Sequence, residues 1–164
     1  MIEAPGVSFE ELLRYDEEQC RHWRDLFEKR PFLLKLEASP RDTIADLLFH
    51  TFTSQFRCAQ RLVGETMTKD SEFSRRTVGD LFDIGDAARI LFRDYLAHAT
   101  QESVSRRQTF PSHTLGEFEA TPKKMLTHAL VHSIRHWGQV ARILRENGHR
   151  ADFSHDLLFS KAFE

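Results

Sequence analysis

The sequence has few cysteines, no long apolar run and almost no excess of charge. Its two cysteines, Cys20 and Cys58, are far apart and match no metal or redox spacing, so a reduced cytosolic protein is expected. The net charge of -2 gives no reason to expect nucleic acid or an anionic membrane as a partner. No apolar run reaches the roughly 20 residues of a membrane-spanning helix, and the first ten residues lack the features of a signal peptide.

A chain of 164 residues is long enough for one domain with a real core, and we expect a single domain over residues 1–164. Four amphipathic segments are bounded by helix start and stop signals. The expected helices cover about 8–29, 40–63, 78–98 and 122–147. Ser8 with Glu11 is typical of a capping box, Pro40 suits a first helical position, and Gly64 suits a C-terminal cap. No stretch alternates between apolar and polar residues over several positions, so a sheet is not expected. The pattern predicts an all-α four-helix bundle.

The segment 101–120 carries no strong helical signal. Loops of this length are uncommon in compact domains and are often functional or mobile. A poorly ordered crossover between the third and fourth helices is the favoured interpretation.

Three histidines, His128, His132 and His136, follow one another at four-residue intervals in the fourth expected helix. Residues four apart share one helical face with Cβ atoms about 5–6 Å apart, so two neighbouring imidazoles can bind one metal ion. Their face is otherwise apolar, and buried imidazoles without a partner cost free energy. The outer two lie about 12 Å apart along the axis, too far for one ion. Spacing therefore leaves two pairs open, and His132 belongs to both.

His50 in the second expected helix is the candidate third ligand. It lies ten residues after Pro40, just as His132 lies ten residues after Pro122. In an up-down-up-down bundle the second and fourth helices run parallel, so both histidines would lie about 15 Å from level helix starts. The polar face around His50 fits either an edge position or a metal cleft open to solvent.

Other residues near the histidines extend the candidate site or its surroundings. Gln139 shares the face of His136 and can bind a substrate, orient a metal ligand or satisfy a buried carbonyl. Ser54, one turn from His50, is a weak candidate for orienting a ligand. Trp137 and Leu130 lie on another side of the same helix, which therefore needs cover from a neighbouring helix or from a second subunit.

Several segments resemble the DinB/YfiT-like superfamily. They are L-L-F-H in the second expected helix, then G-E-F-E-A-T-P-K-K-M-L-T-H, H-S-I-R-H-W-G-Q and L-R-E-N-G, and the likeness extends over about residues 12–159. The resemblance implies an up-and-down four-helix bundle that binds one divalent metal ion, commonly nickel or zinc, with iron, copper and manganese as further candidates. Carried over, the ligands are His50, His132 and His136, while His128, Gln139 and Ser54 surround them. A homodimer is also implied.

Three protein ligands leave open positions on an ion, which is typical of a catalytic site. An ion of this kind lowers the pKa of a bound water or thiol. Because characterised relatives include thiol-dependent enzymes, the first interpretation is a metal-dependent thiol S-transferase or related detoxification enzyme. Its substrate would be a small molecule and its partner a low-molecular-weight thiol.

Two alternatives stay open beside thiol transfer. A metal-activated hydrolase needs a general base, and no carboxylate is placed on the histidine face by spacing. A metal-stabilised small-molecule-binding or stress protein without turnover needs only that the ion joins two helices. Conjugation of a thiol to an electrophile, tested with and without metal, separates the first interpretation from these two.

Overall fold

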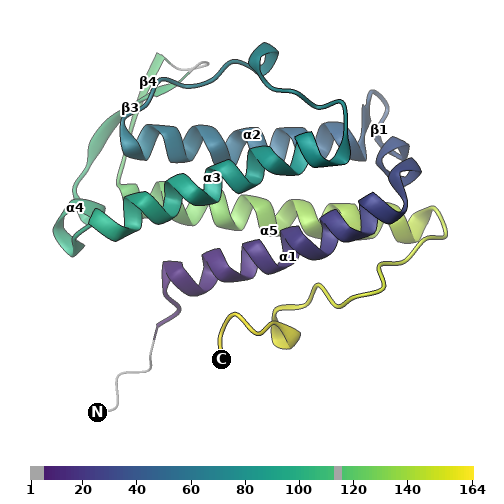
Figure 1. The fold of residues 1–164 in the computed structure, drawn as a ribbon. Helices are drawn as coiled ribbons and strands as arrows, with labels where there is room; N and C mark the ends of the chain where they lie inside the picture. Colours follow the sequence, from purple (N-terminus) through teal and green to yellow (C-terminus); the bar gives the residue numbers. More distant parts are fainter. Residues whose placement is uncertain (1–5, 113–115) are drawn as a thin grey trace.

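Four long helices form the body of the structure, a computed structural model that describes residues 6–112 and 116–164 (Figure 1). They are α1 (Phe9–Lys29), α2 (Ile44–Val63), α3 (Val78–His98) and α5 (Pro122–Glu146). The shorter elements are η1 (Pro31–Lys35), β1 (Glu37–Ser39), β2 (Asp42–Thr43), η2 (Asp70–Glu72), α4 (Gln101–Ser105), β3 (Gln108–Ser112), β4 (Gly116–Ala120) and η3 (Leu157–Phe159). Among the described helices, none combines the length and the apolar character needed to cross a membrane.

Three of the four expected helices agree with the structure to within one residue at each end. Ser8 and Glu11 form the reciprocal capping box of α1, in which each side chain accepts the backbone N–H of the other residue. The side chain of Thr121 caps α5. Gly64 ends α2 in the left-handed conformation with a φ of 77°, which a residue with a Cβ rarely adopts. These boundaries depend on local chemistry, which the sequence displays directly.

The expected start of the second helix at Pro40 is wrong. Pro40 lies in the turn of an antiparallel hairpin formed by β1 and β2, and α2 begins at Ile44. The hydroxyl of Thr43 accepts the N–H of Asp46, and the carboxylate of Asp46 accepts the N–H of Thr43. This second capping box satisfies two backbone donors, whereas a proline at the first helical position satisfies none.

The segment 101–120 is also more regular than expected. It contains α4 and the hairpin of β3 and β4, whose pairs run from Gln108 opposite Ala120 to Ser112 opposite Gly116. Phe110 is only 3% exposed and packs in the apolar cluster at this end of the bundle. Residues 113–115 of this segment lie outside the described part. The hairpin was missed because each strand has only five residues and few apolar side chains, of which Phe110, Phe118 and Ala120 pack on the bundle.

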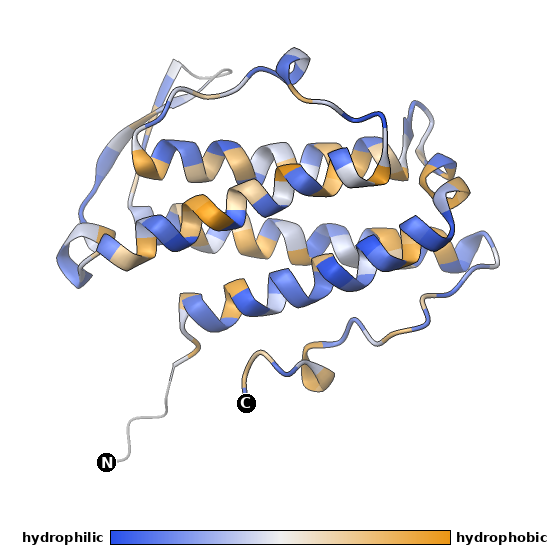
Figure 2. Cartoon of the chain, viewed as in Figure 1, coloured by the Kyte–Doolittle hydropathy of each residue, from blue (hydrophilic) through white to orange (hydrophobic). Residues whose placement is uncertain are grey.

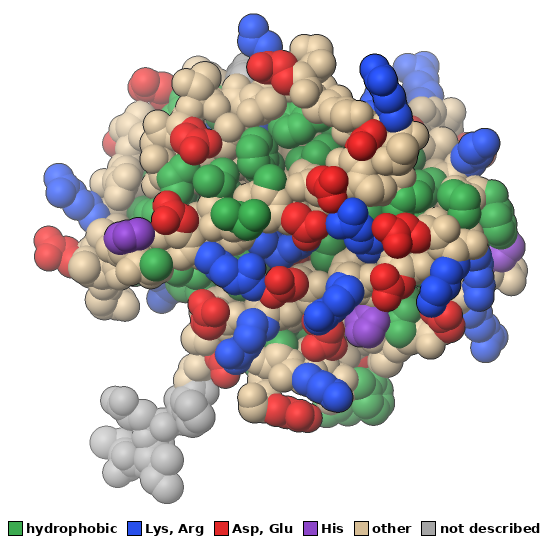
Figure 3. Space-filling view, viewed as in Figure 1, with side chains coloured by type: hydrophobic (Ala, Val, Ile, Leu, Met, Phe, Trp, Pro, Cys, Tyr) green, Lys and Arg blue, Asp and Glu red, His purple; other side chains and the backbone are tan. Residues whose placement is uncertain are grey.

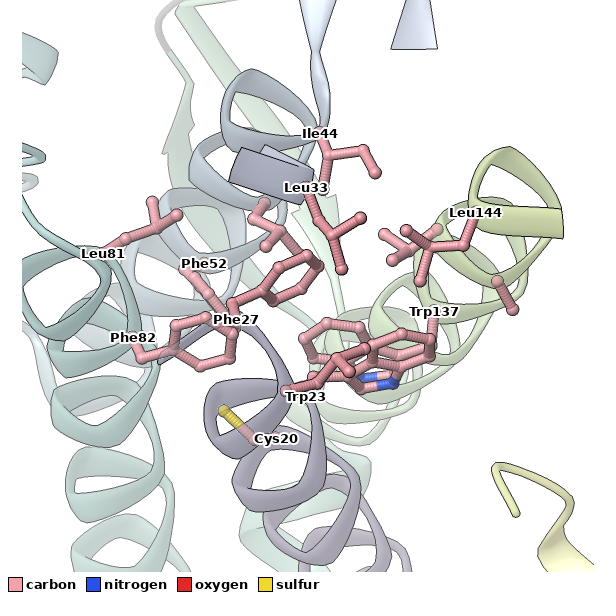
Figure 4. Packing of buried hydrophobic residues seen from close by; sticks show 14 of the residues in the cluster. Cys20, Trp23, Phe27, Leu33, Ile44, Phe52, Leu81, Phe82, Trp137 and Leu144 are labelled. Carbon is pink, nitrogen blue, oxygen red and sulfur yellow. The ribbon is translucent and has the colours of Figure 1, made fainter. Parts of the chain in front are cut away.

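The helices alternate apolar and polar faces, and the apolar faces turn towards one another (Figure 2). Two apolar clusters fill the interior. The first joins the end of α1, the starts of α2 and α3, and the end of α5 (Figure 4). The second joins the start of α1, the end of α2, the later part of α3 and the start of α5. On the outer surface of α1 and α3, acidic and basic side chains are interleaved (Figure 3).

These clusters show which helices run in the same direction. α1 and α5 are parallel, and α2 and α3 run together in the opposite direction (Figure 1). The order is therefore up-down-down-up, and the expected up-and-down order is not what the structure shows. Two consecutive parallel helices require a long connection, and residues 64–77 supply it by returning along the length of the bundle.

The second apolar side of α5 is covered within the chain. Leu130 and Trp137 are 2% and 3% exposed. The indole of Trp137 stacks on that of Trp23 from α1, with ring centroids 5.8 Å apart and planes inclined by 10° (Figure 4). Of the two ways to cover this side, packing against a neighbouring helix is therefore the one found, and these residues give no support for a homodimer.

A buried polar cluster with one residue from each long helix lies between the two apolar clusters. Its members are Asp16 of α1, Gln55 of α2, Arg89 of α3 and Ser133 of α5, all at most 2% exposed. The carboxylate of Asp16 accepts hydrogen bonds from Arg89 at 3.1 Å, from Gln55 at 3.1 Å and from the hydroxyl of Ser133. A buried charge is tolerated only when it is paired and hydrogen-bonded, so this cluster fixes how the four helices slide past one another.

Replacing Asp16 with Ala is expected to destabilise the protein by about 3 kcal/mol or more, because a buried Arg89 loses one of its two carboxylate partners. The control is Glu17→Ala, which removes the surface ion pair with Arg93 and should cost roughly 0–1 kcal/mol. Equilibrium unfolding in urea measures both. Equal losses in the two variants would contradict a central role for the Asp16 cluster.

Candidate metal centre

The three histidines His50, His132 and His136 converge where the first half of α2 passes the middle of α5. His50 comes from the second turn of α2, and the other two come from successive turns of α5. One ring nitrogen of each lies within 4.8 Å of the others. The Nε2 atoms of His132 and His136 are 3.0 Å apart, and the ring of His50 lies 5.1 and 5.4 Å from their rings between centroids.

The reason His50 reaches this place differs from the one expected. The equal-depth argument assumed that α2 starts at Pro40 and runs parallel to α5, and both assumptions are wrong. Because α2 and α5 are antiparallel, residues early in α2 lie beside residues late in α5. His50, six residues into α2, thereby faces His132 and His136.

Burial keeps two of the imidazoles neutral. His136 is 5% exposed, His132 is partly buried and His50 is exposed. Burial lowers the pKa of His132 to about 3, and the neighbouring His136 and His50 add to the effect. Burial also lowers the pKa of His136. Both rings are therefore unprotonated at neutral pH, the state in which a ring nitrogen can bind a metal ion.

The hydrogen bonds of His132 and His136 leave an unresolved conflict that an ion would remove. His136 Nδ1 lies 2.5 Å from Oε1 of Gln139 and donates its proton there, so Nε2 of this neutral ring carries the lone pair. Nδ1 of His132 is buried and has no hydrogen-bond partner among the residues that the structure describes. If His132 carries its proton on Nδ1, its Nε2 lone pair faces that of His136 at 3.0 Å. If it carries the proton on Nε2 instead, its buried Nδ1 is an acceptor without a donor. A cation between the Nε2 atoms fits this donor set.

Gln139 has one of the roles that the sequence left open. Its side-chain oxygen accepts the hydrogen bond from His136 and thereby sets both the tautomer and the orientation of that ring. Gln139 is itself exposed. Among the three readings of this residue, the orientation of a neighbouring imidazole is the one that the geometry favours.

The other two candidates lie further from the convergence point. His128 is exposed, and its ring lies 5.5 Å from that of His132 between centroids, but its nitrogens are outside the converging set. Ser54 is partly buried and lines neither of the hollows described next.

Two hollows open beside the histidines. The acidic hollow, about 560 Å³, is lined by His50, His136, Gln139, Leu47, Ala38, Ser39, Arg142, Ile143 and the carboxylates of Glu37, Asp42, Asp46 and Glu146. The basic hollow, about 540 Å³, is lined by His132, His128, Thr121, Lys123, Lys124, Thr127, Val131 and Arg135. Both volumes are in the range of small-molecule sites.

The carboxylates of the acidic hollow were missed at the level of sequence. Glu37 and Asp42 belong to the hairpin of β1 and β2, and Glu146 ends α5. Only the antiparallel packing of α2 against α5 brings these segments to the histidines. The sequence could have indicated only that Asp46 lies near His50, because it precedes His50 by one turn on the same helix.

Comparison with known proteins gives one family and one fold. The model described as DinB family matches residues 6–160 of the chain. No curated protein matches the chain. A crystal structure of a DinB-like protein from Bacillus subtilis, YjoA, is similar over 88% of this chain and 96% of that chain, with a TM-score of 0.58. At 18% identity this likeness shows the fold alone.

The stability of the metal-free protein should fall as the pH drops from about 7 to about 5. In this range the unfolded chain protonates a histidine with an ordinary pKa of 6.5, whereas folded His132 takes up a proton only near pH 3, so acid favours unfolding. A His132→Gln variant should lose less stability over the same range. Urea unfolding of chelator-treated protein measures the change, with the exposed His128→Gln as control. The same pH loss in His132→Gln and wild type would contradict the assignment.

Proposed function

The chain belongs to the DinB family, and on that premise we propose that it is a metal-dependent thiol S-transferase. His50, His132 and His136 would bind one divalent ion, nickel or zinc, and a low-molecular-weight thiol would be transferred to an electrophilic small molecule. The observation that carries the proposal is the convergence of three imidazole nitrogens within 4.8 Å.

The chemistry of the donor set supports an ion at this place. Two rings are neutral, and one of them is held by Gln139 so that its lone pair points at the other. Neutral imidazole nitrogens suit zinc, nickel, copper and iron. Three protein ligands leave open positions, through which the ion supplies Lewis acidity and lowers the pKa of a thiol.

The surrounding residues determine how substrates reach the site. His50 is exposed, so one side of the histidine group is open to solvent. His132 lines the basic hollow, whereas His50 and His136 line the acidic one. Two separate approaches suit a reaction between two molecules, with the thiol entering from one side and the electrophile from the other.

The thiol has to come from outside the chain. Cys20 and Cys58 are both buried, and neither lines the basic or the acidic hollow. Burial raises the pKa of Cys20 to about 12 and also raises that of Cys58. Because the thiolate is the nucleophile, these two side chains are inert at neutral pH.

Hydrolysis by an activated water is the second candidate, and the carboxylates of the acidic hollow are the observation that favours it. A general base must be free to take a proton. Asp46 accepts the N–H and hydroxyl of Thr43, and the backbone hydrogen bond in particular lowers its pKa, which makes it a weak base. Glu146 is paired with Arg142. Two of the four carboxylates are therefore engaged, and hydrolysis stands as the second candidate beside thiol transfer.

Metal content should follow the three proposed ligands. The wild type and the His128→Ala variant should bind about one ion per chain, and His132→Ala should bind almost none, because both histidine pairs that the spacing allows include His132. Elemental analysis of protein purified without chelator measures this, and added nickel should raise the melting temperature only of the binding proteins. Loss of metal in His128→Ala with retention in His136→Ala would show that the other histidine pair binds the ion.

Conjugation of mercaptoethanol to monochlorobimane tests the reaction. The thiol gives up its proton, a carbon–sulfur bond forms and chloride leaves, so fluorescence reports the product. We expect turnover with the metal-loaded wild type, and only the uncatalysed rate after chelation or in His132→Ala. Turnover that persists without metal, or activity confined to an ester panel, would contradict thiol transfer; the second result would favour the hydrolase.

A further inference from the structure

The basic hollow lies along the outer face of α5, next to His132, and its charge is of one sign. Lys123, Lys124 and Arg135 line it together with His128, and no carboxylate does. The chain as a whole carries a net charge of -2. The basic hollow is therefore positively charged, although the chain as a whole is slightly negative.

None of these three cations is neutralised by the protein. Across residues 6–112 and 116–164, the side chains of Lys123, Lys124 and Arg135 form no ion pair and no hydrogen bond. Other arginines near the surface, such as Arg24 and Arg93, are paired with carboxylates. The basic hollow thus offers donors that are free for an anion.

The acidic hollow is different, because two of its four carboxylates are paired with arginines. Asp42 accepts a hydrogen bond from Ser39, Asp46 is held by Thr43 and Arg75, and Glu146 is paired with Arg142. Within the described residues, Glu37 has no such partner there, and Asp42 has only the hydroxyl of Ser39. The basic hollow, by contrast, has no acidic side chain in its lining to offset its three cations.

We propose that the basic hollow binds a carboxylate of the thiol, so that the co-substrate is an anionic thiol; this inference rests on the proposed function. Arg135 follows His132 by three residues, so a carboxylate a few bonds from the sulfur would meet it first. Lys124 lies eight residues before His132, about 12 Å along the axis, which leaves room for a larger thiol with a second carboxylate.

The shape and the surroundings of the basic hollow favour a small anion. Its volume of about 540 Å³ suits a small molecule. It begins at the N-terminus of the 25-residue α5, where the helix dipole adds positive potential. The exposed Val131 lies on its floor and can contact the carbon chain between sulfur and carboxylate.

Three thiols that differ in charge but little in size test the inference. Mercaptopropionate, mercaptoethanol and cysteamine are titrated into nickel-loaded protein, and the sulfur-to-nickel charge-transfer absorption reports binding without turnover. Mercaptopropionate should bind about tenfold more tightly than mercaptoethanol, and cysteamine should bind most weakly.

A double variant and a matched control separate recognition by the protein from chelation by the thiol itself. Lys124→Gln with Arg135→Gln should bring mercaptopropionate to the affinity of mercaptoethanol and leave the affinity for mercaptoethanol and the metal content unchanged. Arg145→Gln removes an exposed arginine of the same helix that lines neither hollow and should keep the preference.

The possible failures have different meanings. Equal binding of all three thiols, tightest binding of cysteamine, or a preference that survives in the double variant would overturn the carboxylate site and leave thiol transfer standing. Absence of a charge-transfer band with any of the thiols would overturn the proposed function and this inference together.

Discussion

The buried carboxylate of Asp16 is the interaction on which the arrangement of the bundle depends. Donors from α2, α3 and α5 meet it at the level where the two apolar clusters separate. Apolar contacts tolerate small sliding of one helix along another, whereas a buried charge with three directed hydrogen bonds does not. Ser133 lies between His132 and His136 in sequence, and Gln55 lies little more than one turn after His50. The same contacts that satisfy Asp16 therefore set the relative height of the three histidines.

The site that results is polar, asymmetric and open. His136 is oriented by Gln139, His132 is partly buried with one unpartnered nitrogen, and His50 faces solvent. Around them the hollows differ in charge, and the chain's own thiols are buried elsewhere. Membership of the DinB family shows what kind of bundle this is. The donor set supports the proposed metal ion, and the two hollows and the inert cysteines suit the proposed transfer of an external thiol.

Local features were predictable from the sequence, and long-range ones were not. Helix ends at Ser8, Gly64 and Thr121 follow from capping, which involves residues within one turn. Pro40 misled because a capping box three residues later was the stronger signal. Helix direction depends on contacts between distant segments, so neither the up-down-down-up order nor the carboxylates beside His50 could be read from spacing. Spacing showed that neighbouring histidines of α5 share a face but left two pairs open. His50 lies beside His132 and His136, though not for the reason of equal depth that the sequence suggested.

The central claim is that three imidazoles from two antiparallel helices hold a single ion. X-ray absorption spectroscopy at the zinc edge of zinc-loaded protein tests it most directly, because scattering from imidazole rings counts the histidine ligands. We predict one ion per chain with three imidazole nitrogens at about 2.0–2.1 Å, and open positions filled by lighter ligands. Fewer than three imidazoles on the ion, or a spectrum that is the same for wild type and His50→Ala, would contradict the account.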